Sequence, residues 1–215
     1  MDFADDQADL GVLGYLAGRR AGDGVPYFDA SFLDHARGPI LAGALGLRGM
    51  GAAMAASGSV ALYYVEGVTP KPPAAFGKIE NSKLEKVSID RKQLDELYEK
   101  YPGADAEIVA LGCPHCSLSE LNRIAELLDG KKVKKELWVC TARKIANAHP
   151  ELVARIERSG AKIICDTCMV VSPVMEQYGL VMVNSGKAFA YVPDMCGAAV
   201  RLGTTEECIR MATGG

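Results

Sequence analysis

Small residues dominate the hydrophobic pattern at the start of the chain. Apolar residues recur at helical spacing within 10–18, and the Gly- and Ala-rich stretch 49–57 predicts a second helix. Glycine weakens an isolated helix but lets two helices approach closely. The continuous apolar run 59–65 predicts one buried strand. We therefore expect residues 1–75 to form a Gly/Ala-rich helical segment with one strand.

The pattern changes after the three prolines within 70–73, which interrupt regular structure and favour a domain boundary between residues 75 and 76. Short apolar runs then predict strands at 107–111, 136–140, 161–165 and 180–183. The starts of the intervening helices are indicated by Asp90, Ser117, Pro150 and Thr204. Because such alternation implies parallel pairing, we expect residues 76–215 to form a three-layer α/β/α domain with a mainly parallel sheet.

Composition and charge narrow the function classes. Of the 215 residues, 49% are hydrophobic and 24% are charged, and the net charge is −3. This balance supports a packed core and lacks the basic excess typical of nucleic-acid binding. No apolar run approaches the roughly 20 residues of a membrane helix, and the acidic stretch Met1–Asp6 does not resemble a secretion signal. We expect a cytoplasmic protein without nucleic-acid or membrane partners.

Cysteine usage points to chemistry. Five of the seven cysteines fall between Cys113 and Cys168. An odd, clustered set differs from the paired disulfide framework of a secreted domain and indicates a metal site or redox chemistry. A single cysteine is also at home as a small buried apolar residue. The pattern assigns no role to Cys140, Cys196 or Cys208.

Three polar segments follow predicted strands and are candidates for a common site. They are 112–117 (Gly-Cys-Pro-His-Cys-Ser), 165–168 (Cys-Asp-Thr-Cys) and 184–187 (Asn-Ser-Gly-Lys). The carboxyl ends of parallel strands meet at one edge of a sheet, where ligands bind in open α/β folds. We therefore expect these segments to converge.

Two functions follow from the cysteine spacing alone. The pairs Cys113/Cys116 and Cys165/Cys168 fit a tetrahedral zinc or iron–sulfur site, although the two pairs are farther apart than in a compact zinc ribbon. The Cys-Pro-His-Cys motif between a strand and a helix fits thiol–disulfide exchange, since a helix N-terminus lowers the pKa of a thiol. That second interpretation leaves Cys165 and Cys168 unexplained.

Cationic side chains supply candidate anion contacts. Arg19 and Arg20 stand beside the Gly-containing stretch 21–24, where guanidinium groups can bind a carboxylate or phosphate bidentately. The same arginines equally suit a solvated helix end. The stretch 184–187 is a weaker anion-binding signal, because it lacks the leading glycine of a P-loop.

Seven segments, spread almost end to end, resemble the aconitase X family. They are 14–20 (Gly-Tyr-Leu-Ala-Gly-Arg-Arg), 25–28 (Val-Pro-Tyr-Phe), 52–58 (Ala-Ala-Met-Ala-Ala-Ser-Gly), 65–70 (Val-Glu-Gly-Val-Thr-Pro), 111–115 (Leu-Gly-Cys-Pro-His), 166–168 (Asp-Thr-Cys) with Ser172 and Pro173, and 184–190 (Asn-Ser-Gly-Lys-Ala-Phe-Ala) with Tyr191 and Pro193. The resemblance implies an aconitase-like fold and an iron–sulfur dehydratase that removes water from a small hydroxy acid. The substrate that it favours is 5-phosphomevalonate of the archaeal mevalonate pathway, with cis-3-hydroxyproline as the alternative.

The resemblance also implies roles for individual residues. Cys113 and Cys168 are the expected ligands of an iron–sulfur cluster, of the 4Fe–4S type. Cys116 and Cys165 stand where the family pattern does not demand cysteine, which weakens the four-cysteine zinc interpretation. Residues 1–75 are expected on the substrate side. The expected substrate-binding residues are Arg19, Arg20, Ser57, Asn184, Ser185 and Lys187. No catalytic residue is identified.

Family large subunits are roughly twice as long as this chain, and their third cluster cysteine lies in the N-terminal half. They work with a small swivelling subunit that carries a catalytic serine. The resemblance therefore implies three partners: the N-terminal half of a large subunit, the small subunit, and a small anionic substrate. We expect this chain alone to be inactive.

Overall fold

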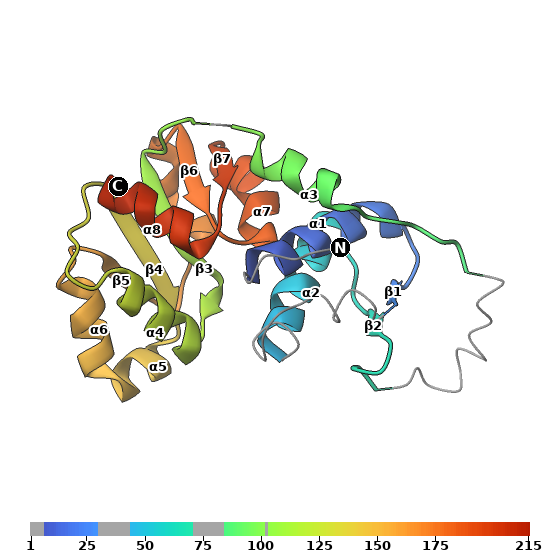
Figure 1. Cartoon of the computed structure of the whole chain (residues 1–215), viewed down its shortest axis with the longest axis horizontal. Coiled ribbons are helices and arrows are strands. Elements are labelled where there is room, and N and C mark those ends of the chain that lie inside the picture. The colour runs from blue at the N-terminus through green and yellow to red at the C-terminus, as the bar shows by residue number, and fades with distance from the viewer. Residues whose placement is uncertain (1–6, 30–43, 71–83, 102) are drawn as a thin grey trace.

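The computed structural model describes residues 7–29, 44–70, 84–101 and 103–215. In Figure 1, a parallel sheet lies between two layers of helices. The predicted α/β fold class with a three-layer domain is thereby confirmed. The domain boundary predicted between residues 75 and 76 lies outside the described residues.

The sheet consists of parallel strands in the order β5-β4-β3-β6-β7, counted over the described part of the chain. Their bounds are Ile108–Cys116 for β3, Glu136–Thr141 for β4, Lys162–Cys165 for β5, Leu180–Val183 for β6 and Ala199–Leu202 for β7. β3 is central and is buried on both faces, which explains its continuous apolar run. Two short strands, β1 (Tyr27–Phe28) and β2 (Tyr64–Val65), form a separate parallel pair.

Helices cover both faces of the sheet. One layer comprises α4 (Leu118–Leu127), α6 (Pro150–Glu157) and α8 (Thr205–Thr213), and α5 (Arg143–Ala148) precedes α6. The other face carries α7 (Gly186–Cys196) with the 3-10 helices η4 (Met169–Val171) and η5 (Pro173–Gln177). α1 (Gln7–Ala21) and α2 (Ala44–Gly58) pack against α7, and α3 (Arg91–Tyr98) contacts α1 and β7. None of the helices within the described ranges is long and apolar enough to cross a membrane.

Alternation along β3 divides the hydrophobic core in two. Ile108 and Ala110 pack into the core beneath α7 and α1, whereas Val109 and Leu111 pack into the core beneath α4, α6 and α8. Successive side chains of a strand point to opposite faces, so one strand supplies both cores. Cysteines on neighbouring positions of these strands therefore also fall into different cores: Cys113 and Cys140 into the first, and Cys116 into the second.

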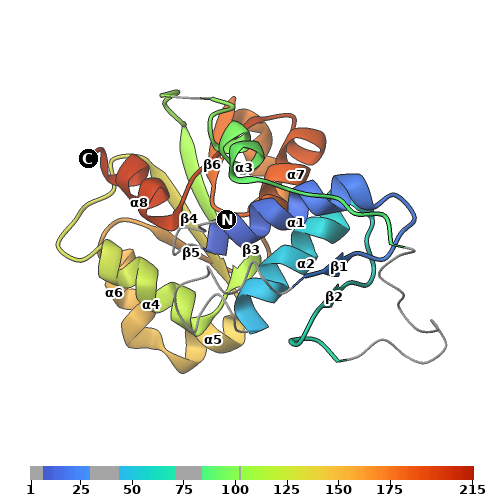
Figure 2. The same cartoon turned by 45° about the vertical axis from the view of Figure 1, so that its right-hand side comes forward.

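Glycines bring α1 and α2 into backbone contact. A Cβ built on Gly14 would lie 2.2 Å from the carbonyl oxygen of Met50, and one built on Gly58 would lie 1.9 Å from that of Gly18. No side chain fits at either distance, so the small residues that weaken these helices in isolation are required by their packing. The two helices lie side by side in Figure 2.

The predicted helix starts are confirmed. The side chains of Asp90, Ser117 and Thr204 each accept a hydrogen bond from the backbone N–H three residues later, and each belongs to a capping box. α6 begins at Pro150, as expected for proline in the first turn. Local sequence signals, three capping boxes and one proline in the first turn, therefore agree with the tertiary structure at all four helix starts.

Other predicted elements need correction. Within the predicted strand 59–65, only Tyr64 and Val65 form a strand, because their partner β1 is itself two residues long. β1 was not predicted, so this part of the chain contains a strand pair rather than one strand. Ser59 has a φ of 56°, a left-handed conformation that separates α2 from the extended stretch.

The prediction also missed α7 and β7. The stretch 184–187, interpreted as a loop, instead contains the N-cap of α7: the Ser185 side chain accepts a hydrogen bond from the Ala188 N–H at 3.1 Å. The buried side chains of α7 recur at helical spacing, at Ala188, Phe189, Val192 and Cys196. β7 follows Gly197 and is four residues long, too short for a distinct sequence signal.

Candidate metal centre

The candidate site lies where the strand order of the sheet reverses. The chain runs from β3 outward to β4 and β5, and then returns to the other side of β3 to form β6. Cys113 belongs to the carboxyl end of β3, and Ser185 stands two residues after the end of β6. A reversal point of this kind forms a crevice outside the carboxyl ends of the strands, the usual ligand position in open α/β sheets.

A backbone irregularity sets the position of Cys113 at this end of the sheet. The pairing of β3 with β4 shifts between Leu111 and Cys116. Gly112 has a φ of +94°, and a Cβ on it would lie 2.2 Å from the carbonyl oxygen of Cys140. Only glycine meets both conditions without strain. The turn places Cys113 in the core beneath α7 and Cys116 in the core beneath α4.

Neighbouring elements hold both ends of this turn. The Ser185 hydroxyl donates to the Cys113 carbonyl at 2.5 Å, and the buried Thr141 hydroxyl donates to the Cys116 carbonyl at 2.7 Å. The first bond comes from the start of α7 and the second from the end of β4. The end of β4 and the N-cap of α7 therefore hold the irregular segment 113–116 in position.

Cys168 reaches the same place from the segment after β5. A hydrogen bond from the Cys113 thiol lowers the pKa of Cys168 to about 5, against the opposing effect of burial, and backbone hydrogen bonds from Val170 and Val171 lower it further. The same bond, together with burial and the nearby charge of Cys168, raises the pKa of Cys113 well above its usual range. At neutral pH the pair is therefore a thiolate paired with a thiol.

α7 brings a positive charge to the cysteine pair. The charge of Lys187, in the first turn of α7, favours the ionised form of both thiols. It adds to the lowering of the Cys168 pKa, whereas at Cys113 it only partly opposes the hydrogen bond to Cys168 and the burial that raise the pKa. Gly186 lets the start of α7 pack directly against α1: a Cβ on it would lie 2.1 Å from the carbonyl oxygen of Gly11. Two of the predicted substrate-binding residues, Ser185 and Lys187, thus lie beside the two predicted metal ligands.

The other four predicted substrate-binding residues lie elsewhere. Asn184 donates to the Thr205 hydroxyl at 3.1 Å, toward α8. The Ser57 hydroxyl donates to the Tyr15 carbonyl at 2.9 Å, between α2 and α1. Arg20 donates to the Ser88 carbonyl at 2.9 Å and lines a pocket of about 300 Å³ with residues of β1 and of 84–89. The fourth residue, Arg19, is exposed near the end of α1. Their roles toward substrate stay predictions.

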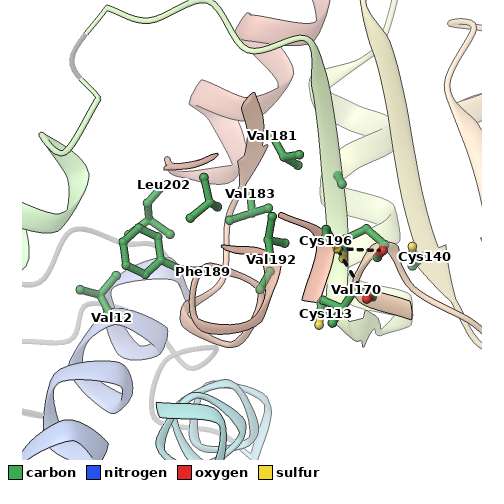
Figure 3. Close-up of a cluster of buried hydrophobic side chains, with 14 of the residues drawn as sticks. Val12, Cys113, Cys140, Val170, Val181, Val183, Phe189, Val192, Cys196 and Leu202 are labelled. Carbon is green, nitrogen blue, oxygen red and sulfur yellow. Dashed lines mark hydrogen bonds between the residues drawn. The ribbon is translucent and has the colours of Figure 1, made fainter. Parts of the chain in front are cut away.

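Two cysteines to which the sequence assigns no role line the segment that carries Cys168. The Cys196 thiol donates to the Val170 carbonyl at 3.5 Å, and Cys140 receives a backbone hydrogen bond from Met169. Figure 3 shows Cys113, Cys140 and Cys196 near Val170 on one side of the sheet. Burial raises the pKa of Cys140 to about 12, so it is a neutral thiol. The sequence signal that could have placed Cys140 on this side of the sheet is the alternation of side chains along its strand.

The donor set fits two ligands of an iron–sulfur cluster. Thiolate sulfur is the usual protein ligand of such clusters, and one thiol of the pair is already ionised near neutral pH. Within the described ranges, no group of three or more His, Cys, Asp or Glu side chains is arranged to hold a metal ion. All seven cysteines are described, and none of them forms a disulfide.

Comparison with known proteins identifies the family. Residues 1–99 match the model of the aconitase X second domain, and residues 106–214 match that of the aconitase X third domain. The large subunit of phosphomevalonate dehydratase from Methanosarcina mazei is 51% identical over 97% of this chain and 50% of its own length. The cis-3-hydroxy-L-proline dehydratase of Pseudomonas aeruginosa is 30% identical over 98% of this chain and 37% of its own length.

A solved structure agrees with these matches. Aconitase X from Thermococcus kodakaraensis, in its holo-form, superposes with a TM-score of 0.81 at 36% identity, over 96% of this chain and 52% of that chain. The chain thus spans about half the length of the phosphomevalonate dehydratase large subunits and of the solved chain. On the two family models, which together match nearly all of its residues, the chain belongs to the aconitase X family.

Proposed function

We propose that this chain is part of the large subunit of an iron–sulfur hydro-lyase that dehydrates 5-phosphomevalonate. The observation that carries the proposal is the Cys113–Cys168 pair at the strand-order reversal, beside the charge of Lys187. Two large subunits of phosphomevalonate dehydratase are 51% and 42% identical to this chain, whereas two cis-3-hydroxy-L-proline dehydratases are 30% and 29% identical. The absence of a membrane-spanning helix in the described ranges is compatible with a cytoplasmic location.

Cys113 and Cys168 would hold the cluster, of the 4Fe–4S type, and its third ligand would come from the N-terminal half of the large subunit. When bound, such a cluster supplies an iron with an open coordination position, which acts as a Lewis acid toward the leaving hydroxyl group. The chain's own contribution is to favour the ionised form of Cys168 through hydrogen bonds and to hold it, partly buried, beside the buried Cys113.

Dehydration breaks one C–H and one C–O bond, forms a C=C bond and releases water. It therefore needs a base for the proton as well as an acid for the hydroxyl group. We assign the base to the catalytic serine of the small swivelling subunit, as the family resemblance implies. Lys187 and the capped start of α7 would hold an anionic group of the substrate in register. The roles of Arg19, Arg20, Ser57 and Asn184 as further substrate contacts belong to this proposal.

Geometry favours this function over a redox module. A thiol–disulfide enzyme cycles its two motif cysteines through one disulfide. Cys113 and Cys116 belong to hydrophobic cores on opposite faces of the sheet, so their thiols point apart. A four-cysteine zinc site would need the same two thiols to converge. cis-3-Hydroxyproline stays the alternative substrate, because its dehydratases match over nearly the whole chain at lower identity.

The test is the cluster content of the large subunit after anaerobic reconstitution with iron and sulfide. We expect Cys113→Ser and Cys168→Ser to lose most of the bound iron and sulfide, and Cys116→Ser, the matched control on the opposite face, to retain them. Full cluster content in either of the first two variants would show that the ligand assignment is wrong.

A further inference from the structure

The two segments that carry the cysteine pair are joined by a side chain outside the pair. The Nε2 atom of His115 lies 2.9 Å from the carbonyl oxygen of Thr167. A carbonyl oxygen only accepts hydrogen bonds, so Nε2 carries the hydrogen. His115 stands two residues after Cys113, and Thr167 directly precedes Cys168. The bond therefore connects the two segments beside both thiols.

His115 is itself held from α2. Arg48 donates through Nη1 to the His115 carbonyl at 3.0 Å, and its Nη2 lies 3.0 Å from Oε2 of Glu120. The same Glu120 oxygen accepts the Ser117 N–H at 2.7 Å. Arg48 lies in the region that matches the second family domain, whereas His115 and Glu120 lie in the third. The two domain regions thus meet at the turn that carries Cys113.

A second bridge serves a different purpose. Thr141 accepts a hydrogen bond from the Asp166 N–H at 3.0 Å and donates to the Cys116 carbonyl. Thr141 is fully buried, and through these two bonds it connects Asp166 and Cys116 to the end of β4. His115 is only partly buried, and its bond reaches Thr167, the residue directly before Cys168. Loss of its hydrogen bond should therefore leave the fold intact and loosen Cys168 relative to Cys113.

We propose that His115 is a positioning residue for metal binding, which sets the separation of the Cys113 and Cys168 sulfurs through its hydrogen bond to the Thr167 carbonyl. Arg48 supports it by fixing the His115 backbone. This inference rests on the proposed function of the cysteine pair as metal ligands. Hydrogen-bonding partners around metal ligands typically change metal affinity by about 10- to 100-fold when removed.

A matched pair of variants isolates the hydrogen bond. The amide N–H of His115→Gln can reach the position of Nε2, whereas His115→Met has a similar length and no donor. His115→Ala is a second donor-free variant. The 215-residue chain, with Cys165→Ser to remove a partly exposed thiol, is titrated anaerobically with Cd²⁺, and binding is followed by thiolate-to-metal charge-transfer absorption. Thermal unfolding of the metal-free chains is recorded in parallel.

We expect the donor-free variants to bind Cd²⁺ about 10-fold more weakly and His115→Gln to stay within about 2-fold of the parent chain, at nearly unchanged melting temperature. Parental affinity in the donor-free variants would overturn the proposal, and so would an equal loss in all three variants, which would indicate packing of the imidazole. Parental affinity in Cys113→Ser or Cys168→Ser would instead show that the cysteine pair is not the metal site.

Discussion

Two side chains with lowered pKa values, Cys168 and Glu136, lie at opposite ends of the sheet. At the carboxyl end, the environment of Cys168 favours a thiolate, an arrangement suited to metal binding. At the amino end, Glu136 begins β4 and accepts hydrogen bonds from Lys162, Trp138 and Tyr178. These bonds lower the pKa of Glu136 to about 2, and the bond from Lys162 has the largest effect. The stability of the fold therefore depends on pH through a residue that lies away from the candidate site.

The lowered pKa of Glu136 predicts acid sensitivity. A carboxyl group with a lower pKa in the folded state contributes stability above its ordinary pKa, which is lost as pH falls from about 4.5 toward about 2. We expect Glu136→Gln to reduce the free energy of unfolding at pH 7 by about 1 kcal/mol. The difference from the unmodified chain should shrink as pH falls below 4.5.

Urea unfolding at a series of pH values between 7 and 3 measures this difference. Glu157→Gln, which changes an exposed glutamate on α6, is the matched control and should have little effect at any pH. A constant difference between Glu136→Gln and the unmodified chain across this range would contradict the assigned pKa.

At the scale of elements, the close contact between α1 and α2 depends on glycines, which have no side chain. Gly14→Ala would force a Cβ to within 2.2 Å of the Met50 carbonyl oxygen, and the helices would have to separate. We expect a loss of about 2 kcal/mol in the free energy of unfolding, within the range for overpacking, despite the better helix propensity of alanine. Chemical denaturation followed by circular dichroism measures it.

Gly49 supplies the control in the same helix pair. A Cβ on this residue of α2 would meet nothing within 4 Å. Gly49→Ala should therefore gain up to about 1 kcal/mol from helix propensity. If Gly14→Ala proved as stable as Gly49→Ala, close approach of the two helices would not be a requirement of the fold.

At the scale of the whole molecule, the cysteine pair offers two ligands, while the family relatives are about twice as long as this chain. Dehydration within a closed cleft requires a positioned base in addition to the metal. We expect an anaerobic assembly of complete large subunit, small subunit and iron to convert 5-phosphomevalonate, and the 215-residue chain alone to show no turnover.

Product formation from 5-phosphomevalonate and from cis-3-hydroxyproline, assayed side by side, checks this expectation. Conversion of hydroxyproline alone would replace the proposed substrate but keep the reaction class. Turnover by the isolated chain would show that the base and all cluster ligands lie within it.

Much of this architecture follows from the sequence by itself, because its causes are local. The capping residues Asp90, Ser117 and Thr204 act on backbone groups three residues away. The apolar runs mark buried strands, and their alternation with helices implies parallel pairing. The cysteine-bearing segments could therefore be assigned to the ends of strands, and the resemblance selected Cys113 and Cys168 among seven cysteines.

Only the tertiary structure decided which groups meet. Whether a thiol is ionised depends on donors and charges that arrive from other elements, here Cys113, the backbone of η4 and Lys187 on α7. The division of Cys113 and Cys116 between two cores depends on the irregular turn at Gly112, and the contact between His115 and Thr167 joins residues 52 positions apart. Distances of this kind are set by the packing of whole helices against the sheet, and no local pattern along the chain encodes them.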